Sequence, residues 1–529
     1  MVKKFLRITL LLSLTLTCLY PSFQWKVSRQ EPRYGGVFRL RSFADVFKPE
    51  LDPASPDSFI FISEQIYDGL VRLDKNLNVV PSLAEYWEIS NDGCRYVFHL
   101  RKDVRFHDGQ GVTADDVKFS LERLLDKKTD SPYFSFFLNR VEGAAEFREG
   151  DATQVSGFKV LDKHTLEIHW TRPFISALYL LSMHFCKILP ADQVQGKGRG
   201  FFQKPQGTGA FQFEYWLRDS QLKIVGVRLK RNEEYFEGRP YLSAVEFCPY
   251  FTLDHFLNSE IDSIPVLSEK LLESHYKIYQ DGSLHQVFLG MSCHLPPLDR
   301  LEVRKSISHG VNRTRLALTI RDARVLKQVA HSFIPPRLPG FFPSEDERTF
   351  NPDRAREMLQ QAGFSAENEF PSLDLFLEGP RTASKNRLDR EIKSQLEAIG
   401  IKTRSQYYRS PEEIRQRTRP YLVILERLMN FPDPEDIIRP LFFSKSISNL
   451  IGYNNPALDN LLYRAEVEKS WTERIVLFHK MEDLLSSDMP AIPLYSQENN
   501  VAIQPYVMGV DWPPLGLYYL EAKKIWLDK

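Results

Sequence analysis

The spacing of apolar residues changes along this chain, and that change limits the fold more than any other feature. In the first half apolar and polar side chains alternate, as at Tyr96, Phe98 and Leu100, which is the period of a strand with one buried face. In the second half apolar residues recur every three or four positions between helix start and stop signals. The pattern predicts mostly strands in the first half and an α/β region over residues 351–490.

Helix and strand boundaries can be predicted from single residues. Thr113 stands three residues before Asp116, a spacing that predicts a capping box at a helix start. Further helix starts or ends are indicated at Asn351, Gly363, Gly400, Pro456 and Ser470. Strands are expected over 158–170, 211–229, 373–377 and 401–408.

Length and composition place the chain among large globular proteins. With 529 residues it is long enough for roughly three domains at about 150 residues each. Apolar residues make up 43% and charged residues 26%, unlike a disordered chain. Lys plus Arg and Asp plus Glu both number 69, and no basic cluster stands out, so the sequence predicts no nucleic-acid partner.

The first residues have the layout of an export signal. Lys3, Lys4 and Arg7 precede an apolar run from Ile8 to Leu16, which is shorter than the roughly 20 residues that span a bilayer. Cys18 closes the run in a setting similar to a lipoprotein cleavage box, with Thr before the Cys instead of Gly or Ala. The sequence therefore predicts periplasmic export, with lipidation of Cys18 as an open alternative to simple cleavage.

Signatures of enzyme and metal sites are missing from the sequence. It contains no nucleophile elbow, P-loop, zinc-protease helix motif or dinucleotide fingerprint, and its twelve His lack metal-ligand spacing. We expect no catalytic residues, no metal and no cofactor. Four widely spaced cysteines allow two disulfides in an oxidising compartment without specifying the pairing: Cys94, Cys186, Cys248 and Cys293.

Several motifs occur in an order and spacing that resemble the extracellular solute-binding proteins of the oligopeptide/dipeptide ABC-importer family, bacterial solute-binding protein family 5. The motifs are Gly35-Gly36, Leu51-Asp52-Pro53, Ile66 to Leu70, Pro81 to Trp87, Val104 to Gly109, Thr113 to Val117, Pro205 to Phe211, Val303 to Ser306, Phe431 to Pro434 and Tyr453 to Pro456. Most of them also have an architectural interpretation; Gly207 and Gly209, for example, are expected to supply positive φ in a turn.

The resemblance implies an α/β fold, a two-lobed periplasmic binding protein of type II with an extra domain inserted in the first lobe. Residues 1–33 would be the signal sequence and tether. The implied domains are a discontinuous first lobe of 34–75, 205–290 and 500–529, an inserted domain of 76–204 and a second lobe of 291–499. The implied function is capture of a peptide or peptide-like solute between the lobes and delivery to an ABC permease of the inner membrane, by a monomer.

The resemblance also implies the ligand-binding residues. Peptide-binding members pair the ligand backbone with two segments, which here would be Asp57-Ser58-Phe59 and Glu426-Arg427-Leu428. An acidic residue after the second segment usually holds the peptide's ammonium group, but this chain has Asn430 there. Asn supplies no negative charge, so free-amine peptides should bind more weakly unless Glu426 or Asp433 substitutes.

Arg427 has the planar guanidinium that pairs with a carboxylate, which predicts a solute with an acidic or free C-terminal group. Glu426 and Arg427 could instead form a solvated strand edge. Two other functions stay open at this point: a transport-inactive interaction or sensory protein that keeps the fold, and a binder of a non-peptide solute or a metal chelate.

Overall fold

The computed structural model describes residues 31–41, 49–55, 59–266, 271–272, 274–280, 284–319, 325–342, 349–429, 431–513 and 515–529. Tyr34–Lys529 form one unit and Met1–Arg33 a separate one. The predicted signal segment and Cys18 lie outside the described residues. No helix of the described part is long and apolar enough to cross a membrane.

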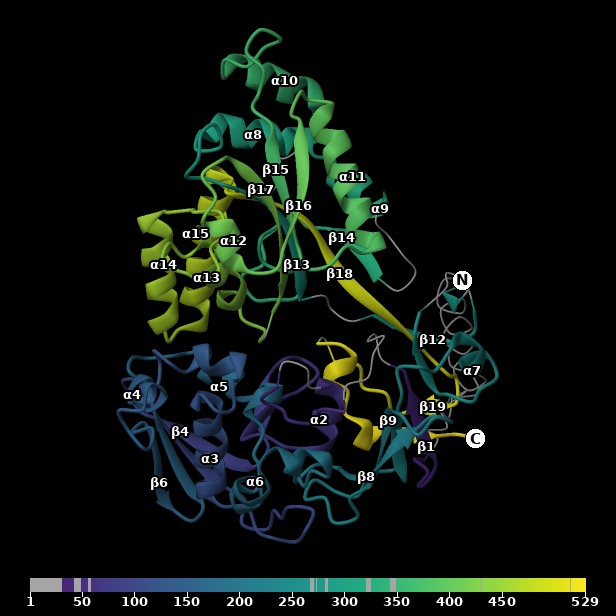
Figure 1. Cartoon of the computed structure of the whole chain (residues 1–529). Coiled ribbons are helices and arrows are strands. Elements are labelled where there is room, and N and C mark those ends of the chain that lie inside the picture. Colours follow the sequence, from purple (N-terminus) through teal and green to yellow (C-terminus); the bar gives the residue numbers. More distant parts are fainter. Residues whose placement is uncertain are drawn as a thin grey trace, which may run out of the picture. The chain divides into compact units, whose positions relative to one another are not determined.

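One large sheet connects most of the chain, and in the described residues it has twelve strands (Figure 1). The main path runs through β16 (Thr403–Tyr408), β15 (Leu373–Glu378), β17 (Tyr421–Leu428), β13 (His285–Met291), β18 (Ala491–Ile503), β11 (Ser263–Pro265), β1 (Val37–Leu40), β10 (Ala244–Phe247), β9 (Ile224–Arg231) and β8 (Phe211–Arg218). Two further strands, β12 (Lys277–Gln280) and β14 (Val325–Val329), pair with β18.

The long strand β18 belongs to both halves of this sheet. Its first part pairs antiparallel with β13 and β14, and its last residues pair with β11 and β12. Figure 1 shows it as a yellow arrow that runs from β13 to β12. One continuous strand therefore links the two halves of the sheet.

Helices surround the half of the sheet that contains β13, β15 and β17. They are α8 (Leu301–Gly310), α9 (Arg313–Thr319), α10 (Pro352–Gln361), α11 (Ala383–Glu397), α12 (Pro411–Arg415), α13 (Glu435–Phe442), α14 (Pro456–Val467) and α15 (Trp471–Asp488). Two cores lie on opposite faces here, one around Leu289 and Leu422 and the other around Phe288 and Val423. Residues i and i+1 of a strand point to opposite faces, so β13 and β17 are buried on both sides.

The segment between β1 and β8 contains a separate antiparallel sheet. Its strands pair in the order β4 (Ala84–Ile89), β5 (Arg95–Leu100), β7 (Thr165–His169) and β6 (Phe158–Asp162). A short hairpin of β2 (Val71–Leu73) and β3 (Val79–Pro81) precedes it. The helical elements are α3 (Ala114–Leu125), η1 (Pro132–Phe136), α4 (Ala144–Glu149), α5 (Ala177–Leu181), η2 (His184–Cys186), α6 (Ala191–Lys197) and η3 (Gly198–Gln203).

The other half of the large sheet is completed by residues from both ends of the described chain. The same part of the molecule contains the helical elements α2 (Ile60–Ile66), α7 (Leu253–Leu257), η5 (Leu517–Tyr519) and η6 (Ala522–Lys524). It also contains a separate two-stranded sheet of β19 (Val507–Met508) and β20 (Trp526–Leu527). Phe38 and Leu40 share a core with Val501, Ile503 and other C-terminal side chains.

The hydrophobic cores can be compared with the expected domain ranges. One core contains side chains between Leu70 and Ile188, together with Ala54 and Phe431. Residues of β13 pair with β17 and share its cores, although the expected boundary after residue 290 placed most of this strand in the first lobe. The domain boundaries themselves stay a prediction.

Most local sequence signals are confirmed. Thr113 and Asp116 form the predicted capping box, and Gly363 and Gly400 have φ of 91° and 89° after their helices. The expected strand at 158–170 is instead the hairpin of β6 and β7, because the turn at Lys163 and His164 reverses the chain.

Candidate functional site

Strand β17 carries the second predicted ligand segment. Its residues are buried from Tyr421 to Leu425, after which Glu426 and Leu428 are exposed. β13 pairs with β17 along its whole length, whereas β15 pairs with it only from Tyr421 to Val423. In the described part of the chain no strand pairs with the remaining residues of β17 on the β15 side.

The direction of the backbone groups at this edge follows from the hydrogen bonds to the β13 side. The Tyr421 carbonyl accepts from Ser292 N–H at 3.1 Å, and Met429 N–H donates to the Leu284 carbonyl at 3.0 Å. Backbone groups alternate along a strand, so odd-numbered residues face β13 and Leu428 faces the opposite edge. Leu428 is 60% exposed, and the end of β17 therefore offers a strand edge to a partner.

Between β17 and α13 the chain contacts the segment from β2 to η3, which we call the inserted segment. Phe431 packs against Phe136 with ring centroids 5.9 Å apart and belongs to the same core as Trp170. Asp433 stands just before Pro434, the N-cap residue of α13, and its Oδ1 accepts from Glu435 N–H at 2.9 Å. The turn thus connects the sheet of β17 to the segment that contains η1 and α5.

Asp433 lies at the centre of a buried contact between these two parts of the chain. Arg474 on α15 binds it through two bonds, Nη1 to Oδ2 at 2.6 Å and Nη2 to Oδ1 at 3.0 Å. Ser176, next to α5, donates from Oγ to Asp433 Oδ2 at 2.7 Å. Asp433 and Arg474 are both fully buried, so the pair is a desolvated and bidentate one.

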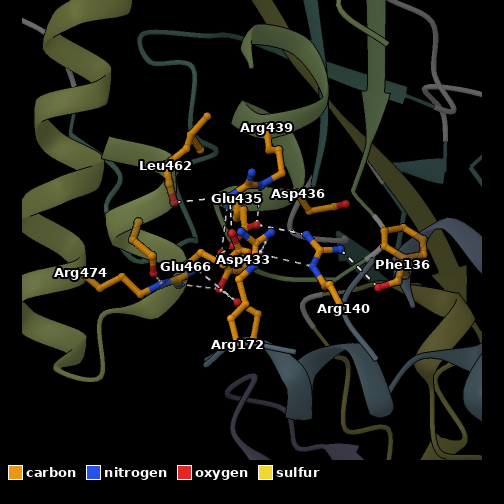
Figure 2. A network of polar contacts seen from close by, with 12 residues as sticks. Phe136, Arg140, Arg172, Asp433, Glu435, Asp436, Arg439, Leu462, Glu466 and Arg474 are labelled. Carbon is orange, nitrogen blue, oxygen red and sulfur yellow. Dashed lines mark hydrogen bonds and ion pairs between the residues drawn. The ribbon is translucent and has the colours of Figure 1, made fainter. Parts of the chain in front are cut away.

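Further ion pairs extend this contact into what we call the interdomain ion cluster, defined as Arg140, Arg172, Asp433, Glu435, Arg439, Glu466 and Arg474 (Figure 2). Arg140 and Arg172 come from the inserted segment. They contact Glu466 of α14, at 3.5 Å from Arg140 Nε and 3.1 Å from Arg172 Nη2. Arg140 Nη2 also lies 3.3 Å from Glu435 Oε1.

The electrostatics of the cluster keep Glu435 ionised. Burial alone would raise the pKa of Glu435, but Arg439, Arg140 and Arg474 outweigh it and lower that pKa to about 2. The pKa of Arg474 is raised, because the attraction of Asp433 outweighs the burial that would lower it. Glu435 and Arg474 therefore do not titrate near neutral pH and both stay charged there.

The other predicted ligand residues are arranged as follows. Arg427 binds Asp436 of α13, from Nη2 to Oδ1 at 2.8 Å and from Nε to the backbone carbonyl at 2.9 Å. Phe59 is the N-cap residue of α2, and its ring packs 5.1 Å from Phe247. Asp57, Ser58 and Asn430 lie outside the described residues.

Sequence reasoning missed every member of the interdomain ion cluster except Asp433. Arg140 and Arg172 carry no local motif, and Arg474 looks like an ordinary residue of the first turn of α15. Only the Phe431-Pro432-Asp433-Pro434 motif indicated this location. The same turn bears Asp433, whose carboxylate is bound by Arg474 and Ser176 in the structure.

A second family motif has a structural role. The His107 ring accepts from Gly207 N–H at Nδ1 (3.1 Å) and donates from Nε2 to the Gly209 carbonyl (3.0 Å), so it is neutral. Burial lowers its pKa to about 4. The prediction of positive φ at Gly207 and Gly209 is wrong, since neither glycine is among the positive-φ residues. A Cβ at either position would instead collide with the backbone at the end of α2.

A polar cavity and four free cysteines are not part of the interdomain ion cluster. One cavity of about 790 Å³ lies between the 103–109 segment and β8–β9, with both acidic and basic residues in its lining. Cys94, Cys186, Cys248 and Cys293 are free cysteines. Within the described ranges no three His, Cys, Asp or Glu side chains are grouped to hold a metal ion.

Comparison with known proteins connects this geometry to a family. The model of the bacterial extracellular solute-binding proteins, family 5 Middle, matches residues 78–449. A dipeptide-binding protein of Escherichia coli is 25% identical over 509 residues, covering 90% of this chain and 91% of that protein. Heme-binding protein A of Haemophilus influenzae is also 25% identical, over 86% of each chain.

Solved structures share the fold. HbpA2 from Haemophilus parasuis superposes with a TM-score of 0.80 at 22% identity, covering 94% of this chain and all of that one. The periplasmic binding protein DppA from Helicobacter pylori, solved with the peptide STSA, superposes with a TM-score of 0.72 at 24% identity over 94% and 99% of the two chains. These likenesses confirm the predicted α/β, two-lobed periplasmic-binding-protein fold.

Proposed function

Because the chain belongs to the bacterial extracellular solute-binding proteins of family 5, we propose that it is the solute-binding component of a peptide-type ABC importer. It would capture a peptide or peptide-like solute and deliver it to a membrane permease. Relatives named dipeptide-binding and oligopeptide-binding proteins support the peptide class. The family's role is binding, and the chain needs no catalytic group for it.

The observation that carries the proposal is the edge of β17 beyond Val423. An extended peptide could add to this edge as a further strand, with main-chain hydrogen bonds that tolerate different side chains. Glu426 and Leu428 belong to this edge by the alternation of backbone groups. Phe59 and its neighbours Asp57 and Ser58 would contact the solute from the first lobe.

The interdomain ion cluster supports a mechanism of hinge closure. We propose that Ser176, Arg140 and Arg172 meet the second-lobe residues Asp433 and Glu466 when the lobes approach each other. Separation would take Ser176 away from Asp433, and Arg140 and Arg172 away from Glu466. The two acidic groups would keep only Arg474 and Arg439 as charged partners, which favours the joined arrangement. A solute held between the lobes would add its own contacts to those of the interdomain ion cluster.

Leu428→Pro tests the edge directly. The substitution removes the backbone N–H that faces away from β13 and leaves the ladder with β13 intact, and proline is tolerated on sheet edges. Leu428→Ala is the matched control, since it shortens the same side chain and keeps the N–H. We expect Leu428→Pro to weaken binding of tri- to pentapeptide pools about fivefold or more in calorimetry, as for one lost hydrogen bond, and Leu428→Ala to bind as the parent does.

Native mass spectrometry of protein purified from an exporting host identifies the solute class. A retained peptide supports the proposal. A retained haem, bile acid or metal chelate would assign a non-peptide solute, in line with relatives named heme-binding and deoxycholate-binding proteins. An empty protein with no thermal shift across the peptide pools would contradict import and favour an interaction or sensory role.

We also propose that the protein is a periplasmic monomer, exported by the signal in residues 1–17, with Cys18 as a lipidation site. Intact mass of the mature protein tests both steps. A mass that begins at Cys18 and carries two or three acyl chains supports anchoring. A mass that includes residues 1–17 would contradict export.

A further inference from the structure

Where the large sheet passes from one half to the other, one of its faces carries a row of polar side chains. Strand β18 pairs without a register shift from Tyr495 to Ile503, so Ser496, Glu498 and Asn500 share a face. Gln286 of β13 lies directly opposite Ser496 and joins this row. We call these four residues, Gln286, Ser496, Glu498 and Asn500, the crossing strip.

Two separate hydrophobic cores border the crossing strip on the same face. Phe288, two residues after Gln286, belongs to the core that contains side chains of α13, α14 and α15. Ala502, two residues after Asn500, belongs to a small core around Phe256. Ser496 and Asn500 are four residues apart, which is about 13 Å along a strand. The sheet therefore carries a polar stretch of this length between two apolar regions.

Two members of the crossing strip are buried without hydrogen-bond partners. Asn500 is 0% exposed, and within the described ranges neither its Oδ1 nor its Nδ2 has a partner. Gln286 is 1% exposed, and its Oε1 has no partner among the same residues. Buried polar atoms of proteins are bonded in the large majority of cases. Two unpaired side-chain amides on one face of the sheet therefore indicate a partner that comes from outside the chain.

The chemistry of the crossing strip favours an uncharged partner. A side-chain amide has an acceptor oxygen and two donor hydrogens but no charge, so it matches the C=O and N–H of another amide. The charged neighbours are matched within the protein: Arg427, which lies opposite Gln286, is bound by Asp436, and Glu498 is attracted by Arg337. A charged group of the solute would be desolvated here without a counter-charge.

We infer that Gln286 and Asn500 bind neutral amide groups of the solute, which makes the crossing strip a second contact region two strands away from the edge of β17. The inference rests on the proposed function, because a solute reaches the strip only between the lobes. Both side chains are enclosed in this arrangement, so the solute meets them while the lobes are apart and is covered when they close. The length of the strip fits an extended tetra- or pentapeptide.

The test compares Asn500→Leu and Gln286→Met with the parent protein in calorimetric titrations. Both substitutions keep the approximate size of the side chain and remove its hydrogen-bonding groups. The probes are two pools of the same pentapeptides, one with free termini and one N-acetylated and C-amidated. Gln361→Met, at an exposed position of α10, is the matched control. Urea unfolding of each protein is measured alongside.

We expect each variant to bind both pools about fivefold more weakly or worse, as for one lost neutral hydrogen bond. The loss should be the same for both pools and at low and high salt, because no charge is involved. The urea midpoints of both variants should be no lower than that of the parent, since an apolar side chain leaves no buried polar atom unpaired. Gln361→Met should bind as the parent does.

Parental affinity of both variants for both pools would overturn the inference and would assign water to the two amides. Weaker binding accompanied by a lower urea midpoint would also overturn it, because the amides would then have a structural role. So would a loss confined to the pool with free termini, since a charged end would then be the group bound. If the parent binds neither pool, the proposed function fails as well, whereas a binding parent with unaffected variants rejects only the role of Gln286 and Asn500.

Discussion

The pairing of Asp433 with Arg474 makes a quantitative prediction about stability. Arg474→Met removes a guanidinium that is fully buried and leaves the Asp433 carboxylate with Ser176 Oγ and Glu435 N–H as its remaining partners. Breaking a buried ion pair from one side costs about 3–5 kcal/mol, because the remaining charge stays desolvated. We expect a loss of that size in the free energy of unfolding.

A double-mutant cycle separates the pair from its surroundings. Asp433→Asn alone should also destabilise the protein, while Asp433→Asn combined with Arg474→Met should cost less than the sum of the two, with a coupling of about 2 kcal/mol or more. The measurement is urea unfolding followed by tryptophan fluorescence and far-UV circular dichroism. Arg464→Met, on the exposed side of α14, is the control and should change stability by less than about 0.5 kcal/mol.

Two results would refute this reasoning. One is an Arg474→Met protein within about 0.5 kcal/mol of the parent, which would mean that the pair contributes nothing in solution. The other is strict additivity in the cycle. If Asp433→Asn weakened peptide binding and left the unfolding free energy unchanged, Asp433 would be a solute-binding residue, as the family resemblance first suggested.

Two further predictions concern the motif that joins the inserted segment to the first lobe. Burial lowers the pKa of His107 to about 4 from an ordinary value of about 6.5, so its contribution to stability is complete above about pH 6.5 and is lost as the pH falls towards 4. The midpoint of urea unfolding should therefore fall between pH 6.5 and 4, and it should fall less steeply in His107→Asn. The same dependence of the midpoint on pH in His107→Asn and the parent would contradict the neutral ring. Gly207→Ala should destabilise the protein by about 1–3 kcal/mol, since its Cβ would lie 1.9 Å from the Ile66 carbonyl oxygen. Gly196→Ala is the control, because open space surrounds that position, and it should unfold at the parental urea midpoint. A parental midpoint for Gly207→Ala would contradict the steric argument.

Local features of the fold could be predicted from the sequence because their causes are local. Thr113 and Asp116 form their capping box within one helical turn, and Gly363 ends its helix within two residues. The positions of strands and helices in the second half followed from the same kind of pattern. A turn within an apolar stretch was harder to predict, since the residues at 163–164 give little signal between β6 and β7.

The candidate site could be located but not described from the sequence. The motif around Asp433 drew attention to the turn before α13, yet Ser176, which binds Asp433, is 257 residues away and Arg140 is 295 residues from Glu435. Nothing in the local sequence of Arg427 tells that Asp436 neutralises it, because this depends on how α13 packs beside β17. Which charged side chains at the end of β17 are bound within the protein depends on such packing.

The sharing of β18 between the two halves of the sheet has a consequence for when the chain can fold. Phe38 and Leu40 near the start of the described chain need Val501, Ile503 and residues beyond them to complete their core. The ribosome makes these partners last, so the earliest segment must wait for nearly the whole polypeptide before it becomes protected. Such a delay suits a chain that is threaded through a membrane before it folds, as the proposed export requires.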